Sequence, residues 1–121
     1  MNLNQVTVPS TDVARAIEFY LQLGLKLIVK SLPKYARFEC PEGQSTFSVH
    51  LVEHVPAPSQ TVVYFECVHL DQKVDSQVEA GIQFVSLPTD QSWLWREAYL
   101  RDPDGNTICL FHAGSNRLNP P

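Results

Sequence analysis

The chain has 121 residues, of which 44% are hydrophobic, and its 9 basic and 13 acidic side chains give a formal net charge of −4. This length suits one domain with a real hydrophobic core and is too short for two ordinary domains. A negative charge without a basic cluster argues against nucleic-acid and anionic-membrane partners. No apolar stretch approaches the ~20 residues that span a bilayer, so we expect no membrane partner.

The N-terminus lacks the basic start and apolar run of a signal peptide. The three cysteines, Cys40, Cys67 and Cys109, are odd in number and form no CxxC pair. This pattern is typical of buried free thiols in a reducing compartment, which predicts a cytoplasmic protein.

The first half of the chain predicts a strand, a helix, a second strand and a hairpin. Residues 3–8 alternate between apolar and polar side chains, as a half-buried strand does. The segment 10–12, Ser-Thr-Asp, offers oxygens that cap a helix N-terminus. The apolar stripe of this helix is predicted to contain Val13, Ala16, Ile17, Tyr20 and Leu21. Gly24 suits the left-handed residue that ends a helix.

The second half repeats the first. Residues 5–24 align with residues 62–81 without a gap, so that Gly24 matches Gly81. Further along, residues 35–43 align with residues 97–105, and both segments end in Pro-acid-Gly. The inward face of the second helix is predicted to contain Leu70, Val74 and Val78. A polar loop is expected at residues 88–92.

Specific motifs carry a resemblance to a known family. The segment 8–12, Val-Pro-Ser-Thr-Asp, followed by residues 15–20, Arg-Ala-Ile-Glu-Phe-Tyr, looks like the opening of vicinal oxygen chelate proteins, the glyoxalase/bleomycin-resistance superfamily. Residues 101–107, Arg-Asp-Pro-Asp-Gly-Asn-Thr, look like the final hairpin of these proteins. The resemblance covers residues 1–112.

This resemblance implies an α+β fold of two tandem βαβββ modules, which form a curved mixed sheet around a concave cleft. Module one would cover residues 1–53 and module two residues 60–112, within a single domain 1–112. A linker would occupy residues 54–59, and residues 113–121 would form an irregular C-terminal tail. Many relatives pair two chains, so we expect a homodimer.

Family members with metal activity place four ligands on the first and last strands of the two modules. The first position falls on Gln5, which is a usual ligand, and its repeat partner falls on Val62, which cannot bind a metal. The last-strand position of module two, usually glutamate, falls on Cys109. Its counterpart in module one lies near Ser48 or His50, because the hairpin after Gly43 is longer. The usual four-ligand site is therefore altered, and Gln5 and His50 are the candidate metal ligands.

Alternation along each strand predicts which side chains share the concave face. Glu66 is the candidate catalytic residue, because a carboxylate inside the apolar strand 62–67 needs a partner, neutrality or a wet cavity. The candidate ligand-binding residues combine aromatic walls with a few polar groups, as small-molecule pockets do. They are Gln5, His50, Tyr64, Arg37, Trp95, Glu97, Tyr99 and Cys109.

Three functions are compatible with these residues. The first is a metal-free protein that binds a small molecule in the cleft, as in the drug-sequestering branch of the family. The second is a lyase, isomerase or dioxygenase that uses one divalent ion, Zn²⁺, Ni²⁺, Fe²⁺ or Mn²⁺, with an atypical ligand set. The third is a metal-free enzyme with Glu66 or His50 as general base. The sequence leaves the choice between binding and catalysis open, and it does not give the substrate.

Overall fold

The computed structural model describes residues 1–55 and 59–119, and these residues form two compact units. Of the described residues, the first unit contains 1–55, 59 and the hairpin 102–106, and the second contains 60–101 and 107–119. Part of the predicted linker 54–59 lies outside the described residues. Within the described part of the chain, no helix has the length and apolar character needed to cross a membrane.

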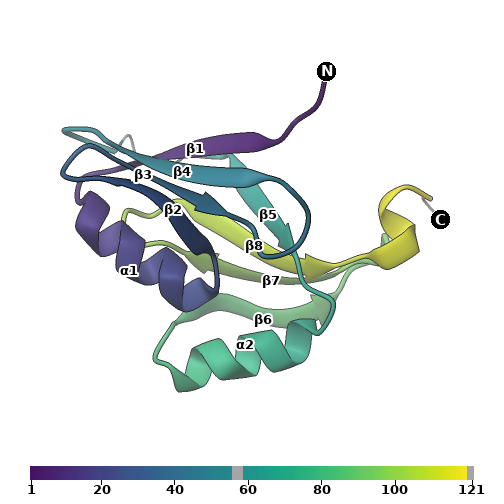
Figure 1. Ribbon diagram of the computed structural model, residues 1–121. Helices are drawn as coiled ribbons and strands as arrows, with labels where there is room; N and C mark the ends of the chain where they lie inside the picture. The colour runs from purple at the N-terminus through teal and green to yellow at the C-terminus, as the bar shows by residue number, and fades with distance from the viewer. Residues whose placement is uncertain (56–58, 120–121) are drawn as a thin grey trace. The chain divides into compact units, whose positions relative to one another are not determined.

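Each unit contains one βαβββ module, as predicted (Figure 1). The first module consists of β1 (Gln5–Ser10), α1 (Val13–Leu23), β2 (Lys26–Ser31), β3 (Tyr35–Glu39) and β4 (Thr46–Leu51). The second consists of β5 (Val62–Glu66), α2 (Leu70–Glu79), β6 (Phe84–Asp90), β7 (Arg96–Arg101) and β8 (Thr107–His112). The eight strands form two four-stranded sheets, with the orders β1-β4-β3-β2 and β5-β8-β7-β6. The first and last strands of each module are parallel and the other pairs are antiparallel, so both sheets are mixed.

Helix α1 begins and ends as the sequence predicts. The Asp12 side chain accepts a hydrogen bond from the Arg15 N–H at 3.1 Å, which satisfies one free donor of the first turn. Gly24 has φ 110° and ends the helix in the left-handed conformation that glycine adopts without steric cost.

The buried faces of both helices differ from the prediction at one position each. Leu21 of α1 and Val78 of α2 are 46% and 47% exposed, whereas Leu23 and Gln77 are buried. Leu21 and Val78 each follow the first helical residue by eight positions. At 3.6 residues per turn the eighth position has rotated away from the first, while the seventh, Gln77 in α2, stays on the same face.

The core of the first unit lies between α1 and its sheet. Tyr20, Phe38 and Phe47 are almost completely buried, and the Tyr20 and Phe47 rings are 4.6 Å apart between centroids. Rings at this separation contribute about 0.5–1.5 kcal/mol beyond the area that they bury. The side chains of this core alternate along β3 and β4 with side chains on the opposite face of the sheet.

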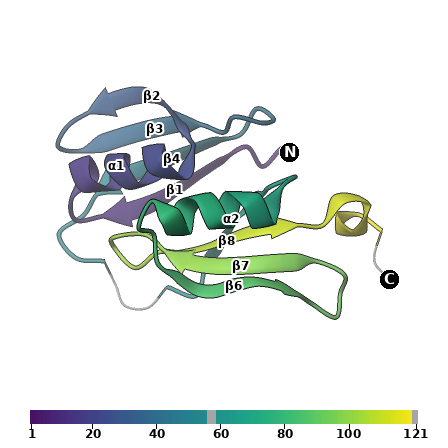
Figure 2. The ribbon, with the colours of Figure 1, turned by 90° about the horizontal axis from the view of Figure 1, so that it is seen from below.

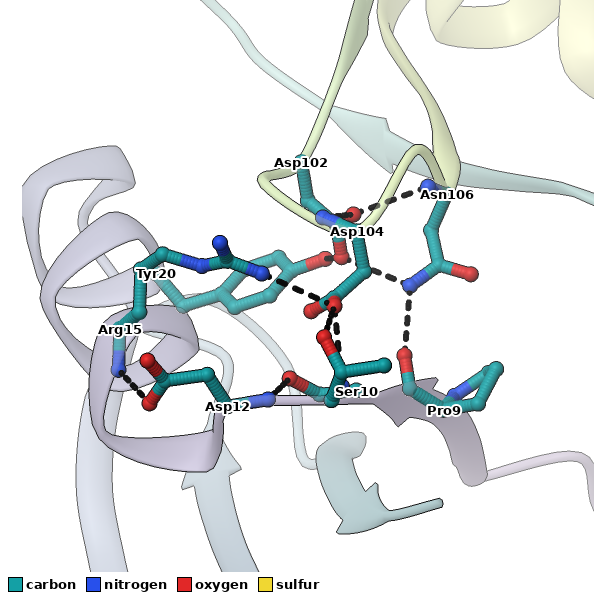
Figure 3. Close-up of polar contacts among 9 residues, drawn as sticks. Pro9, Ser10, Asp12, Arg15, Tyr20, Asp102, Asp104 and Asn106 are labelled. Atoms are coloured by element: carbon teal, nitrogen blue, oxygen red, sulfur yellow. Dashed lines mark hydrogen bonds and ion pairs between the residues drawn. The ribbon is translucent and has the colours of Figure 1, made fainter. Parts of the chain in front are cut away.

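A polar network ties the hairpin 102–106 into the first unit (Figure 3). The Tyr20 hydroxyl donates to Asp102 at 2.6 Å, and the Asn106 side-chain amide donates to Asp102 at 2.8 Å and to the Pro9 carbonyl at 2.9 Å. Asp104 accepts hydrogen bonds from the Thr11 N–H and hydroxyl and forms an ion pair with Arg15 at 3.0 Å. Burial and the Asp102 carboxylate both raise the pKa of Tyr20, so its phenol stays protonated as the donor.

Two segments are more regular than the sequence predicts. The expected polar loop 88–92 begins with the end of β6, which runs to Asp90. Pro88 is tolerated there because β6 is an edge strand, where a missing N–H need not break a ladder. The described part of the tail, which was expected to be irregular, contains a 3-10 turn, η1, over Gly114–Arg117.

Candidate ligand-binding site

The strand register settles which residues of the two modules correspond. Gln5 lies opposite Thr46 in the first sheet, and Val62 lies opposite Thr107 in the second. Counting along β4 and β8 from these pairs, Ser48 corresponds to Cys109 and His50 corresponds to Phe111. Ser48 is therefore the module-one residue that corresponds to Cys109, a position that the sequence left open between Ser48 and His50.

In the first unit, the sheet face opposite α1 carries a closed polar network. Gln5 donates through its amide nitrogen to the Ser48 hydroxyl at 2.8 Å, and the Thr7 and Ser48 hydroxyls are 2.6 Å apart. The Thr46 hydroxyl donates to the Gln5 amide oxygen. Ser48 itself is completely buried. The amide of Gln5 is thus held by its own strand neighbours.

Tyr35 and Arg37 extend this face along β3. The Arg37 Nε donates to the Tyr35 hydroxyl at 2.9 Å. Burial pushes the pKa of Tyr35 up, but polar contacts with Ser48, Arg37 and Gln5 outweigh it and leave the pKa below the usual value. Both side chains are candidates for hydrogen bonding to a ligand at this face.

The structure does not bring Gln5 and His50 together. His50 lies opposite Pro9 and Tyr35, four residues beyond Thr46 along β4, and its side chain is exposed. Four residues of a strand span roughly 13 Å, while the Gln5 amide points to Thr46 and Ser48.

In the second unit, the corresponding face is aromatic. The Trp95 and Phe111 rings are stacked with centroids 4.8 Å apart and an interplanar angle of 20°. Tyr64 meets both rings edge-on, at 6.2 Å from Trp95 and 5.5 Å from Phe111. Tyr64 is 45% exposed, so one side of this cluster is open to solvent. The exposed ring of Tyr64 gives this cluster a solvent-facing aromatic surface.

A buried carboxylate lies beside the aromatic cluster. Glu97 is 3% exposed and accepts hydrogen bonds from the Tyr99 hydroxyl at 3.0 Å and from the Trp93 indole N–H at 3.2 Å. The Tyr64 and Tyr99 hydroxyls are 3.4 Å apart. This contact with Tyr64, together with burial and Glu97, raises the pKa of Tyr99 and keeps it protonated. Both carboxylate oxygens of Glu97 therefore accept hydrogen bonds from neighbouring side chains.

Cys109 lies completely buried behind this cluster, packed with Phe111 and Ala113. Burial first, and the nearby Glu97 carboxylate second, raise the pKa of its thiol to about 12. The thiolate, which is the form that attacks or binds metals, is therefore strongly disfavoured at neutral pH.

Glu66 has partners instead of standing bare in its strand. One carboxylate oxygen accepts hydrogen bonds from the Ala113 N–H at 2.7 Å and the Gly114 N–H at 2.9 Å. His112 and Arg117 lie 3.9 and 3.8 Å from the carboxylate. These contacts connect Glu66 to the C-terminal turn, and they are typical of a structural anchor.

The donor set of the four family metal positions does not fit a divalent ion. In the first unit, Gln5 and Ser48 are bonded to each other. In the second unit, Val62 has no donor atom and Cys109 is held as a thiol. Across residues 1–55 and 59–119, no group of three or more His, Cys, Asp and Glu side chains is arranged to hold a metal.

Sequence reasoning named most of the second-unit face, but it did not predict three contacts at the aromatic cluster. The stacking of Phe111 on Trp95, which organises the cluster, was not predicted. Trp93 follows a polar segment, which gave no hint that its indole N–H covers Glu97. Asn116 lies in the tail, where no periodic signal exists, yet it contacts the tryptophan loop.

Known proteins resemble this chain in sequence family and in fold. Residues 2–110 match the model of the Glyoxalase/Bleomycin resistance protein/Dioxygenase superfamily. No curated protein matches. Among solved structures, the chain is similar to a glyoxalase/bleomycin resistance protein/dioxygenase from Nocardioides, with 24% identity, a TM-score of 0.74 and coverage of 93% of this chain and 83% of the other.

Two further structures have the same fold. One is a bleomycin-binding protein complexed with bleomycin, with 20% identity, a TM-score of 0.76 and coverage of 93% of this chain and 98% of the other. The other is a lactoylglutathione lyase from Agrobacterium tumefaciens, with 17% identity, a TM-score of 0.77 and coverage of 92% of each chain. The fold is therefore shared by proteins that bind and proteins that catalyse.

Proposed function

Because the chain belongs to the Glyoxalase/Bleomycin resistance protein/Dioxygenase superfamily, we propose that it binds a small molecule on a β-sheet face, without the family's usual metal site. The ligand we propose is a planar aromatic molecule that carries a cationic or hydrogen-donating group. The observation that carries this proposal is the aromatic cluster of Tyr64, Trp95 and Phe111 beside the buried Glu97 carboxylate.

The aromatic cluster supports a flat ligand for geometric reasons. Trp95 is stabilised on one side by Phe111, and Tyr64 stands at a right angle to both rings. A ring held in this way loses little conformational freedom when a ligand stacks on it, so more of the contact energy appears as affinity. A relative of the same fold is known in complex with bleomycin, which supports binding of an organic molecule by this architecture.

The preference for a cationic or donating ligand follows from Glu97. Its described hydrogen-bond partners, Tyr99 and Trp93, are neutral donors, so its charge is compensated by dipoles. A ligand cation or N–H group that takes the place of the Trp93 indole would meet the Glu97 carboxylate in a buried setting. Aromatic faces also attract cations, which adds about 0.5–2 kcal/mol.

The chemistry of the residues at the metal positions favours binding without a metal. The amide of Gln5 and the hydroxyl of Ser48 already satisfy each other, and the thiol of Cys109 resists deprotonation. Incubation with Zn²⁺, Ni²⁺, Mn²⁺ or Fe²⁺, followed by gel filtration and elemental analysis, tests this part. We expect less than stoichiometric metal, and a tightly bound equivalent that is lost in Gln5→Ala would restore the metalloenzyme alternative.

The ligand class can be tested with two aromatic dyes of opposite charge. We expect the cationic dye thioflavin T to bind saturably at one site and the anionic dye 8-anilinonaphthalene-1-sulfonate to bind much more weakly. Trp95→Ala should weaken thioflavin T binding by about tenfold or more, because the stacking surface is lost. Glu97→Gln should reduce the difference between the dyes. His50→Ala, the exposed position in module one that corresponds to Phe111, is the control.

The proposal fails if thioflavin T does not bind saturably, or if Trp95→Ala and His50→Ala bind it equally well.

We further propose that the protein is a cytoplasmic homodimer. Its sheet edges support association, because Val85 and Leu87 of the edge strand β6 are 63% and 59% exposed. Sedimentation at tens of micromolar, an order-of-magnitude working range well above the dissociation constant of a stable dimer, would show a monomer if this part is wrong.

A further inference from the structure

The C-terminal turn is fastened to the loop that carries both tryptophans. The Trp95 indole N–H donates to the Asn116 backbone carbonyl at 3.4 Å, and the Asn116 side-chain amide donates to the Leu94 carbonyl at 3.4 Å. Figure 2 shows the C-terminal turn at the same end of the second sheet as the loop between β6 and β7. Glu66 holds the start of the turn through the Ala113 and Gly114 N–H groups.

The tryptophan loop, residues 91–95, is strained at Leu94. Leu94 has φ 68°, a left-handed conformation that disfavours a side chain with a Cβ atom. Its side chain is 55% exposed, so burial of leucine does not compensate for this conformation. The loop is closed by hydrogen bonds from the Leu94 N–H to the Gln91 carbonyl at 3.0 Å and from the Gln91 N–H to the Trp95 carbonyl at 2.7 Å. A strained conformation persists only where neighbouring contacts enforce it.

We propose that Asn116 is a positioning residue, which holds Leu94 in the left-handed conformation and thereby keeps Trp95 stacked on Phe111 for ligand binding. Asn116 alone makes both contacts that this role requires. The side chain of Asn116 holds the carbonyl of the strained Leu94, and its main chain holds the indole of the next residue. The tail is thus part of the site without contacting the ligand.

This inference deepens the proposed function and rests on it for the ligand-binding consequence. If the Trp95 side chain can move away from Phe111, it must be ordered again when a ligand stacks on it. Ordering one rotamer-rich side chain weakens binding by up to about tenfold. Loss of Asn116 therefore lowers the affinity for a stacked ligand while the ligand's own contacts remain intact.

Intrinsic fluorescence reports this loop directly, because Trp93 and Trp95 are the only tryptophans of the sequence. In a Trp93→Phe chain the signal comes from Trp95 alone. Asn116→Asp keeps the size of the side chain but cannot donate to the Leu94 carbonyl. We expect it to raise the acrylamide quenching constant of Trp95 about twofold, as local opening exposes the indole. Asn116→Ala, which adds no charge, should do the same.

Asn119→Asp is the matched control. Asn119 lies in the same tail and donates its side-chain amide to Ser115 at 2.9 Å, away from the tryptophan loop. This change should leave the quenching of Trp95 unaltered. Leu94→Gly added to Asn116→Asp should return the quenching constant toward the parental value, because glycine adopts φ 68° without help from Asn116. If the tail only stabilised the fold, Leu94→Gly would not restore the quenching constant of Trp95.

The ligand arm uses thioflavin T and the wild-type tryptophans. Asn116→Asp should weaken its binding up to about tenfold and Asn119→Asp should not. Equal quenching in the two aspartate variants, or failure of Leu94→Gly to rescue, overturns the inference. If quenching changes as expected but wild-type protein does not bind thioflavin T, the loop restraint stands and the proposed function fails. If thioflavin T binds equally to both variants, Asn116 has no role in the site.

Discussion

The two sheets share one strand order, and the register of β1, β4 and β3 matches that of β5, β8 and β7, yet equivalent positions carry different chemistry. In the first unit the face opposite the helix is a set of amides and hydroxyls that bond to each other. In the second unit the same face is aromatic and surrounds a buried carboxylate. The corresponding pairs are Gln5 and Val62, Ser48 and Cys109, Tyr35 and Glu97, Arg37 and Tyr99, and His50 and Phe111.

This difference shows that a repeated backbone does not require a repeated site. In each module, the sheet face that packs against the helix carries the apolar core, and this face is similar in the two modules. The other face carries different side chains in the two modules, because hydrogen-bonded polar groups stabilise one sheet and packed rings stabilise the other. A closed polar network stabilises the first unit but leaves few groups to meet a ligand, whereas the second unit keeps an open aromatic surface.

The largest expected effect compares the corresponding residues Phe111 and His50. Phe111 is 5% exposed and stacks on Trp95, so Phe111→Ala leaves a cavity and should lower the free energy of unfolding by about 3–5 kcal/mol. His50 is exposed, and His50→Ala should change it by less than about 0.5 kcal/mol. Urea unfolding followed by circular dichroism measures both. Equal effects would show that the two faces do not differ as described.

The next effect concerns Glu66 as an anchor. Glu66→Ala removes the acceptor of the Ala113 and Gly114 N–H groups and should lower the free energy of unfolding by about 2 kcal/mol. Glu66→Gln keeps an oxygen for these donors and loses only the charge that faces His112 and Arg117 at the surface. It should cost less than about 1 kcal/mol. A larger loss in Glu66→Gln than in Glu66→Ala would mean that the charge, and not the acceptor, holds the tail.

The architecture was predictable from the sequence because it repeats. Gly24 and Gly81 end equivalent helices, and the Pro-acid-Gly turns of both hairpins give the strand order. The register of β4 was not predictable, because its hairpin loop, residues 40–45, is one residue longer than the loop at residues 102–106. Ser48 and His50 lie two residues apart on one face of β4, so alternation could not choose between them, and the pairing of Thr46 with Gln5 was needed.

Parts of the candidate site depend on contacts that no local pattern encodes. The partners of Glu66 are main-chain N–H groups of residues far along the chain, and any residue supplies such a donor. The same holds for Trp95 and the carbonyl of Asn116. Strand alternation predicts that Tyr64, Glu97 and Tyr99 share a face, and Tyr99 contacts both of the others, but alternation carries no information on which acceptor a side chain reaches.

A smaller effect comes from exchanging the corresponding residues Ser48 and Cys109. Ser48→Cys weakens the hydrogen bonds of this position with Gln5 and Thr7, and Cys109→Ser places a hydroxyl in a completely buried, largely apolar position. Each should lower the free energy of unfolding by about 1 kcal/mol. Chemical denaturation of the two single variants tests this. If Cys109→Ser is neutral, the second-unit face is more polar than its packing indicates.

The smallest effect is a pH dependence that separates the two hairpins. Burial pushes the pKa of Asp104 up, but Ser10, Thr11 and Arg15 outweigh it, so its pKa in the folded protein is below the usual value. A carboxyl with a lowered pKa stabilises the fold above its unfolded pKa of ~3.9, and this contribution disappears as pH falls through the folded pKa. The free energy of unfolding should therefore fall below about pH 4, by less than about 1 kcal/mol from this group, because its Arg15 partner is half exposed.

Asp104→Asn keeps an oxygen for the Thr11 donors but cannot titrate, so its acid limb should be flatter than that of the parent protein. Glu42, which corresponds to Asp104 in the module-one hairpin, is exposed and provides the matched control. Glu42→Gln should leave the dependence on pH as it is in the parent. Urea midpoints between pH 3 and 6 measure all three chains. Because the Thr11 and Arg15 contacts hold the hairpin 102–106 in the first unit, an unchanged acid limb in Asp104→Asn would mean that they do so without a contribution from the charge of Asp104.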